Sequence, residues 1–151
     1  MQQFTLPLRK TTQRPIVVLK HPRPMYAMLD TGAVFPIWVT NEERLKNIGG
    51  VFDRADVPFG GFGGITTGDL YRIPTFCVGE LVFPNFPVIL SPRKLPCQLL
   101  LSATMFSNLI YEIDDKNHRL NFTIPEGESL VRPLNVRIEN GRLHIFCMAG
   151  I

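Results

Sequence analysis

Short apolar runs alternate with polar, proline-rich and glycine-rich segments along the chain. Residues 4–8 alternate apolar with other side chains, and residues 16–19 are continuously apolar. Both patterns predict β-strands, and the polar residues between them predict a turn, so we expect an N-terminal hairpin. A third apolar run, residues 25–29, follows a segment with two prolines and ends at Asp30. The chain therefore begins as β-structure.

Helical signals are confined to two short segments. Thr40 can cap a helix over residues 41–48, because Glu43 stands three residues later and completes a capping box. Ser102 can cap a helical turn over residues 103–108. Both predicted helices are too short to dominate the fold.

Paired apolar runs with turn residues between them predict further hairpins. The clearest signal is Asn140-Gly141, because this dipeptide between alternating apolar residues favours a type I′ turn. Residues 99–101 add a short, fully apolar strand. The predicted hairpins comprise residues 59–68, a glycine-rich tip or loop; residues 71–90, turning at Gly79-Glu80; residues 110–124, turning at 115–117; and residues 134–147.

The composition agrees with a β-rich fold of one domain. Thirteen prolines and twelve glycines are scattered through 151 residues and break the apolar segments into pieces too short for long helices. The length falls in the range of a single domain, and 45% hydrophobic residues suffice for a packed core. We therefore predict an all-β fold, β-rich with two short helices.

Charge and hydropathy limit the partners. Sixteen basic and thirteen acidic side chains give a net charge of +3, which is too small to require a polyanion, so we expect no nucleic-acid partner. No apolar stretch approaches the ~20 residues that span a bilayer. The N-terminus lacks a basic lead into an apolar run. We expect a soluble, non-secreted, cytoplasmic protein with no membrane partner.

Metal, cofactor and nucleotide sites are not predicted. The three cysteines are widely spaced, which favours buried, reduced thiols over a disulfide framework or a zinc cluster. The three histidines have no ligand-like spacing, and we expect them on the surface. No Lys-Ser or Lys-Thr pair follows the glycine cluster, as a phosphate-binding loop requires.

The most informative motif is the turn Asp30-Thr31-Gly32-Ala33, which lies between two apolar runs. An aspartate at the end of a buried strand is costly unless its carboxylate is hydrogen-bonded or shares charge with a partner. Thr31 and Gly32 supply a hydroxyl and backbone N–H groups. The alternative is an Asx-type turn in which Asp30 only hydrogen-bonds its own backbone. The tripeptide alone favours that alternative.

The order of the elements favours a functional aspartate. A hairpin, an apolar strand ending in Asp-Thr-Gly-Ala, a glycine-rich hairpin, an apolar triplet, a short helix and a final hairpin follow one another. This order resembles the retropepsin-like aspartic proteases over about residues 4–124. The resemblance implies a closed, β-barrel-like acid protease lobe within a single domain of residues 1–151. Residues 125–133 then form a connector, and residues 134–147 an additional C-terminal hairpin.

The resemblance also implies roles for individual residues. Asp30 would be the catalytic carboxylate, Thr31 would brace the loop across a two-fold axis, and Gly32 would hold the carboxylates coplanar. Residues 57–70 would form a flap over a bound peptide. A homodimer follows, because the mechanism needs two carboxylates and the chain has one Asp-Thr-Gly. The implied substrate-binding residues are Ala33, Phe59, Gly60, Gly61, Phe62, Gly63 and Gly64.

The implied function is an aspartic endopeptidase that hydrolyses peptide bonds with a water activated between two Asp30 carboxylates. The family usually has glycine at the position of Ser102. That departure, together with the C-terminal hairpin, motivates an alternative: a catalytically silent peptide-binding or dimerisation module on the same fold. A third alternative is an unrelated β-barrel with a structural aspartate.

Three aromatic residues lie near Asp30 in the sequence. We expect Tyr26 in the core, whereas Phe35 and Trp38 can either line a cleft or fill the core.

Overall fold

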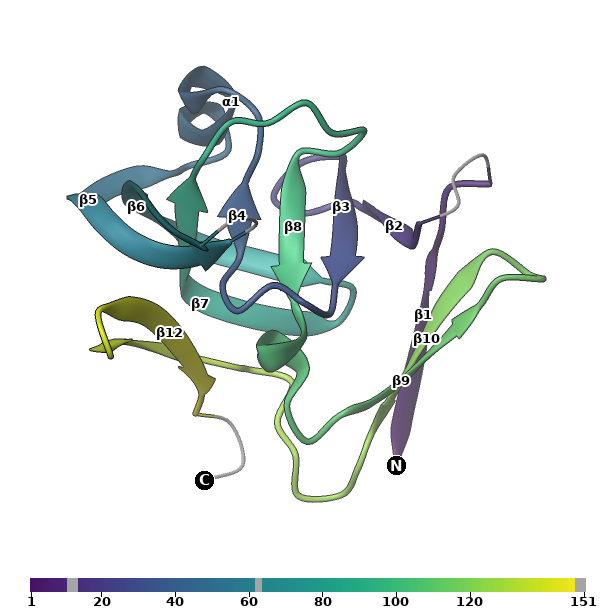
Figure 1. Ribbon diagram of the computed structural model, residues 1–151. Coiled ribbons are helices and arrows are strands. Elements are labelled where there is room, and N and C mark those ends of the chain that lie inside the picture. Colours follow the sequence, from purple (N-terminus) through teal and green to yellow (C-terminus); the bar gives the residue numbers. More distant parts are fainter. Residues whose placement is uncertain (11–13, 62–63, 149–151) are drawn as a thin grey trace.

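The computed structural model describes residues 1–10, 14–61 and 64–148 and is built mainly of β-strands (Figure 1). The predicted all-β class is confirmed. In chain order the elements are β1 (Gln2–Pro7), β2 (Ile16–Leu19), β3 (Met25–Asp30), β4 (Ile37–Trp38), α1 (Glu42–Asn47), β5 (Val51–Gly61), β6 (Gly64–Val78), β7 (Leu81–Leu90), β8 (Leu99–Ser102), the 3₁₀ helix η1 (Ala103–Phe106), β9 (Ile110–Asp114), β10 (Arg119–Ile124), β11 (Leu134–Glu139) and β12 (Arg142–Cys147).

The largest sheet has seven strands in the order β2-β3-β8-β4-β7-β6-β5. Its centre is the trio β3, β8 and β4, which lie side by side in Figure 1. Strands β3 and β8 run parallel, with Ala27 opposite Leu99 and Asp30 opposite Ser102. Strands β4 and β8 pair antiparallel. Parallel strands buried on both faces need continuous apolar runs, which explains the triplet Leu99-Leu100-Leu101.

The expected closed barrel is wrong. Within the described residues the strands form three separate sheets, and β2 and β5 are the outer strands of the largest one. Closure would require these two strands to pair. Instead, β12 packs on β5, while β1, which lies beside β2, belongs to another sheet.

The expected N-terminal hairpin is also wrong. Strand β1 pairs antiparallel with β10, with Leu6 opposite Leu120, and β10 pairs with β9. Only a bridge between Leu8 and Val17 and one further backbone hydrogen bond link the described residues of this region to β2. The aromatic rings of β1 and β10 stack with centroids 5.0 Å apart, and both leucines are buried. This cross-strand packing outweighs the local preference for a hairpin.

Helix α1 is confirmed, but its cap is Asn41 rather than Thr40. The Asn41 side chain accepts a hydrogen bond of 2.9 Å from the backbone N–H of Arg44. The Thr40 hydroxyl is buried without a hydrogen-bond partner in the described part of the chain. Helix η1 is confirmed at the expected place, with Ser102 as its cap. Among the described residues, no helix has both the length and the apolar character needed to cross a membrane.

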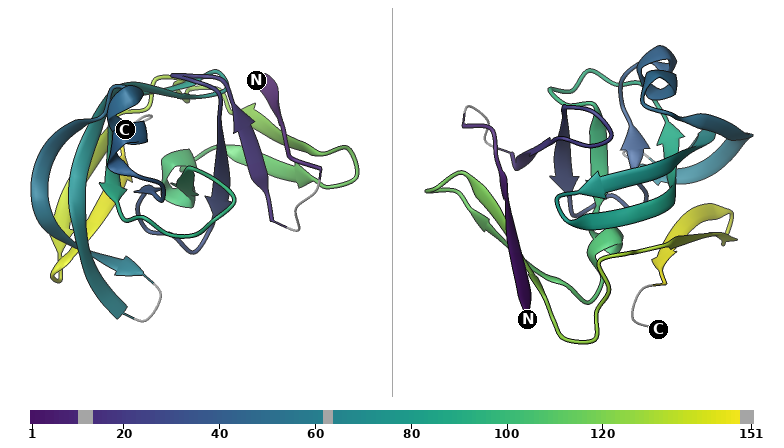
Figure 2. Two further views of the ribbon diagram at one scale, coloured as in Figure 1. Left: turned by 90° about the horizontal axis from the view of Figure 1, so that it is seen from above. Right: turned by 180° about the vertical axis from the view of Figure 1, so that it is seen from behind.

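The C-terminal hairpin β11–β12 forms as the sequence predicts. Its turn residues have positive φ angles, 53° at Asn140 and 71° at Gly141, as a type I′ turn requires. One face carries Leu134, Leu143 and Ile145, all buried in the main core cluster. The hairpin packs beside β5 and η1. In Figure 2 it is the yellow element next to the strands at the edge of the large sheet.

The connector before this hairpin is tied down by Arg132, whose side chain is fully buried. Its guanidinium donates hydrogen bonds to three backbone carbonyls, those of Met105 (3.1 Å), Ser129 (3.4 Å) and Ser107. A carboxylate oxygen of Glu128 lies 3.9 Å from the guanidinium. A buried charge needs such partners, so Arg132 joins the connector firmly to the end of η1.

Candidate active site

Asp30 is the last residue of β3 and is half-buried. The backbone N–H of Gly32 donates a 3.0 Å hydrogen bond to its Oδ1 atom, and the N–H of Ala33 donates a 3.1 Å hydrogen bond to its carbonyl. The turn therefore has the Asx-type hydrogen bond. Within the described residues this is the hydrogen bond that the carboxylate accepts, and it fixes the direction of Oδ1.

Ser102 supports the Asp30 loop from behind. The Ser102 hydroxyl donates a 2.9 Å hydrogen bond to the carbonyl of Ala33. Its oxygen lies 2.6 Å from the Thr104 hydroxyl and 3.3 Å from the Thr104 backbone N–H. Because Ser102 has one proton and donates it to Ala33, the Thr104 hydroxyl must donate to Ser102. The fully buried serine thus ties the loop to β8 and η1.

A cavity of about 640 Å³ opens at Asp30. The β5–β6 hairpin contributes Gly60 and Gly64 to its wall, and β8 contributes Leu100. The loop after Asp30 supplies Gly32, Ala33 and Val34, and Ile37 and Leu95 complete the apolar part. A volume of this size is typical of a ligand-binding cleft.

The structure brings together five of the ten residues that the resemblance assigns to the site. Asp30, Gly32, Ala33, Gly60 and Gly64 all line the same cavity. Gly61 pairs with Gly64 across the hairpin, and Thr31 is exposed on the loop. Phe62 and Gly63 lie outside the described residues. Phe59 is fully buried, so its ring belongs to the core and not to the cleft wall.

The aromatic residues near Asp30 have structural positions. Phe35 and Trp38 are buried in the core, and the Trp38 indole N–H donates a 3.0 Å hydrogen bond to the Asn41 carbonyl. The expectation that Tyr26 is in the core is wrong, because its side chain is 38% exposed and lies under the Arg9 guanidinium, 4.4 Å from the ring centroid. Its neighbours on β3 face inward, so Tyr26 faces outward.

The sequence did not predict the basic part of the cleft. Arg142 and His144 of β12, together with Arg14 and Arg93, line the cavity. A β-carbon added at Gly60 would lie 3.7 Å from Nη1 of Arg142, so the two hairpins meet there. The available signal was the alternation of β12, which places residues 142 and 144 on its polar face. Which element this polar face contacts depends on tertiary packing and could not be predicted from the strand alone.

Among the described residues that line the cavity, Asp30 supplies the carboxylate, and cysteine, serine and threonine do not contribute. All three cysteines are free thiols, and burial raises the pKa of Cys77 and of Cys97. Across residues 1–10, 14–61 and 64–148, no three side chains of the metal-binding types gather around one point. The buried hydroxyl of Ser102 has no access to a substrate. Of the side chains that line the described part of the cavity, those of Asp30 and His144 can act as a general acid or base.

Comparisons with known proteins bear on the fold. No protein-family model matches the chain, and comparison with curated proteins gives no match. Among solved structures, the chain is similar to a retropepsin-like aspartic protease from Rickettsia conorii, with a TM-score of 0.52 and 14% sequence identity over 80% of this chain and 89% of that chain. The chain therefore has an all-β, retropepsin-like fold. This is the fold that the order of the predicted elements around Asp30 resembles.

Proposed function

We propose that the chain is one subunit of a homodimeric aspartic endopeptidase in which Asp30 is the catalytic carboxylate. The observation that carries this proposal is the position of Asp30 at the wall of a 640 Å³ cavity, opposite the glycine-bearing end of the β5–β6 hairpin. The likeness of the fold to a retropepsin-like protease supports the same assignment. A single such domain, residues 1–151, supplies one carboxylate, so the second comes from an identical subunit.

The proposed mechanism uses two Asp30 side chains that share one proton. The ionised carboxylate takes a proton from a bound water as that water attacks the peptide carbonyl, and the protonated carboxyl hydrogen-bonds the carbonyl oxygen. The Gly32 N–H holds Oδ1 of Asp30 in place. Thr31 and Gly32 are exposed, which leaves the loop accessible to a partner subunit. The β5–β6 hairpin closes over the peptide.

The geometry at Ser102 favours an enzyme over a silent module on the same fold. The departure from glycine does not displace the loop from β8, because the side chain itself hydrogen-bonds the Ala33 carbonyl. The loop that carries Asp30 is thus supported by a fully buried partner, as a preorganised catalytic group requires.

A subunit-mixing experiment tests the proposal. Wild-type chain is mixed with Asp30→Asn chain at constant total concentration, allowed to exchange subunits, and assayed on a library of extended peptides. The amide is nearly isosteric but cannot accept the proton of the water. If each site needs both Asp30 side chains, activity follows the square of the wild-type fraction, and an equal mixture retains about one quarter of the activity.

The matched control is Asp115→Asn, which removes an exposed carboxylate from the turn after β9. Mixtures with this variant should keep full activity at every ratio. A linear decrease with Asp30→Asn would show that each subunit works independently with its own Asp30, and an equal mixture that keeps about three quarters of the activity would show that one Asp30 suffices for a shared site. Full activity of pure Asp30→Asn, or no cleavage by the wild-type dimer, would refute the catalytic assignment.

A further inference from the structure

The cleft around Asp30 is lined by basic side chains. Arg14, Arg93, Arg142 and His144 border the cavity, and Asp30 is the acidic residue among the residues that line it. The chain as a whole carries a net charge of only +3, so this concentration of positive charge belongs to the cleft and not to the general surface.

Two of these guanidinium groups have no acidic partner. Arg93 and Arg142 form no ion pair with any residue in the described part of the chain. Arg142 stands opposite Glu139 in the β11–β12 register, yet no ion pair joins them. A guanidinium group that lines a cleft and forms no ion pair is available to a carboxylate of a ligand. It can bind that carboxylate through two parallel hydrogen bonds.

Each of these residues is held in position from its backbone. The N–H of Arg93 donates a 2.8 Å hydrogen bond to the Val39 carbonyl. Arg142 and His144 alternate along β12 with the buried Leu143 and Ile145, so the core fixes the opposite face of the strand. The backbone therefore places these side chains at the cleft, and the exposed guanidinium groups of Arg93 and Arg142 can turn toward a ligand.

We propose that the C-terminal hairpin is a specificity element that adapts the cleft to acidic peptide segments, with Arg142 as the principal residue that binds an Asp or Glu side chain of the substrate. The inference rests on the proposed function and names its substrate class. Arg142 lies next to Gly60, so the acidic side chain is bound where the two hairpins meet. Arg93 extends the positive surface along the cavity.

The test separates binding from turnover by using the Asp30→Asn chain. Fluorescent peptides are compared in pairs that differ only by Glu and Gln, and their dissociation constants are measured by anisotropy at low and high salt. The Glu peptide should bind about tenfold more tightly at low salt, as one charge-assisted contact provides. Arg142→Gln in this background should remove most of the preference, and Arg142→Lys should keep part of it.

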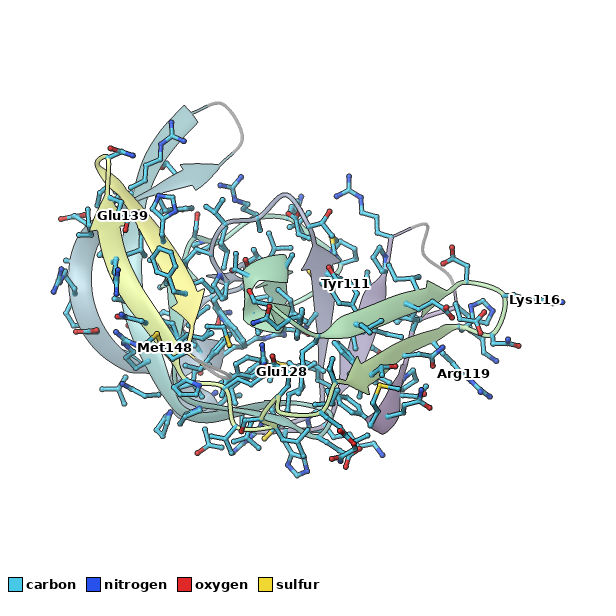
Figure 3. All side chains as sticks on the ribbon, turned by 90° about the horizontal axis from the view of Figure 1, so that it is seen from below. Tyr111, Lys116, Arg119, Glu128, Glu139 and Met148 are labelled. Atoms are coloured by element: carbon cyan, nitrogen blue, oxygen red, sulfur yellow. The ribbon has the colours of Figure 1, made fainter. Side chains whose placement is uncertain are left out.

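The matched control is Arg119→Gln, which makes the same chemical change at the far end of the molecule. Figure 3 shows Arg119 on the opposite side of the molecule from Glu139, and Glu139 is the last residue of β11 before the turn of the C-terminal hairpin. This control should keep the full preference for Glu. Equal affinity for Glu and Gln peptides, or an equal effect of the Arg142 and Arg119 changes, would overturn the inference. A single-stranded oligonucleotide that binds as tightly as the Glu peptide, with the same dependence on Arg142, would overturn it as well.

Failure of this inference is distinguishable from failure of the proposed function. Wild-type cleavage of Glu and Gln peptides at equal kcat/KM, with equal binding, would reject the acidic specificity and leave the protease proposal intact. Charge-selective binding that depends on Arg142, with no cleavage by the wild-type dimer, would support the specificity and reject the protease proposal.

Discussion

The β5–β6 and β11–β12 hairpins border the same cleft, but the rest of the molecule holds them differently. The inner face of β11–β12 is buried through Leu134, Leu143 and Ile145, and Arg132 anchors the chain just before it. In β5–β6 the last buried side chain of the first strand is Phe59. Beyond it lie Gly60, Gly64 and the exposed Thr66 and Thr67, with open space around Gly64.

Backbone hydrogen bonding between two strands does not by itself decide how firmly a hairpin is held. Both hairpins pair antiparallel up to their turns, although the register of β5–β6 shifts between Phe52 and Val57. Local opening is governed by the buried apolar contacts that must be broken, and β12 makes such contacts through Leu143 and Ile145. The C-terminal hairpin therefore offers a wall of the cleft that the core holds in place. The proposed closure of β5–β6 over a ligand would occur against that wall.

Breaking the anchor of the fixed hairpin should have the largest effect. Arg132→Ala leaves the carbonyls of Met105, Ser107 and Ser129 without this donor and Glu128 without its cation. We expect the free energy of unfolding to fall by about 3 kcal/mol or more, measured by urea denaturation. Arg137→Ala is the control, because Arg137 is exposed and lies over the Phe146 ring, and its loss should cost less than about 1 kcal/mol. Equal losses would show that Arg132 is no anchor.

Adding a methyl group at two glycines of β5–β6 should sharpen the contrast within that hairpin. At Gly68 a β-carbon would lie 2.6 Å from Cγ2 of Ile89 and 2.9 Å from the Leu90 carbonyl oxygen. Gly68→Ala should therefore lower the free energy of unfolding by about 1–3 kcal/mol. At Gly60 the nearest atom is 3.7 Å away, and Gly60→Ala should change stability by less than about 0.5 kcal/mol. The reverse order would place tight packing near the tip.

The smallest effect is expected at the turn of the C-terminal hairpin. Asn140 has a φ of 53°, which most L-residues adopt only with strain. Asn140→Ala should lower the free energy of unfolding by about 1 kcal/mol, whereas Asn140→Gly should stay close to the wild type. A thermal melt of the three proteins measures this difference. Equal melting temperatures for the alanine and glycine variants would mean that the turn relaxes to another conformation.

Local signals in the sequence predicted much of the fold and part of the site. The apolar run before Asp30 placed that residue at the end of β3, and Ser102 capped η1 as expected. The Asn140-Gly141 pair gave the correct turn. Each of these features depends on residues within a few positions of one another, where propensity and hydrogen-bonding chemistry decide the outcome.

Features that depend on distant residues were not predictable in the same way. Strand β1 pairs with β10, and the Phe4 ring stacks on the Phe122 ring. These residues are far apart in the sequence, so no local pattern predicts their contact. The outward position of Tyr26 and the arrival of Arg142 and His144 at the cleft depend on which surface of each strand the tertiary structure covers. The alternation of side chains along these strands could be predicted, but the elements that cover each face could not.

The hydroxyl pair at positions 102 and 104 has a consequence for finding distant relatives. A signature that requires glycine after two apolar residues would miss this chain, although its loop is supported at the same point by Ser102. The Thr104 hydroxyl donates its hydrogen bond to Ser102 Oγ, so the residue types at positions 102 and 104 depend on each other. We expect relatives with serine at this point to carry a second hydroxyl residue two positions later, and searches built on that pair would reach sequences that a glycine-based pattern passes over.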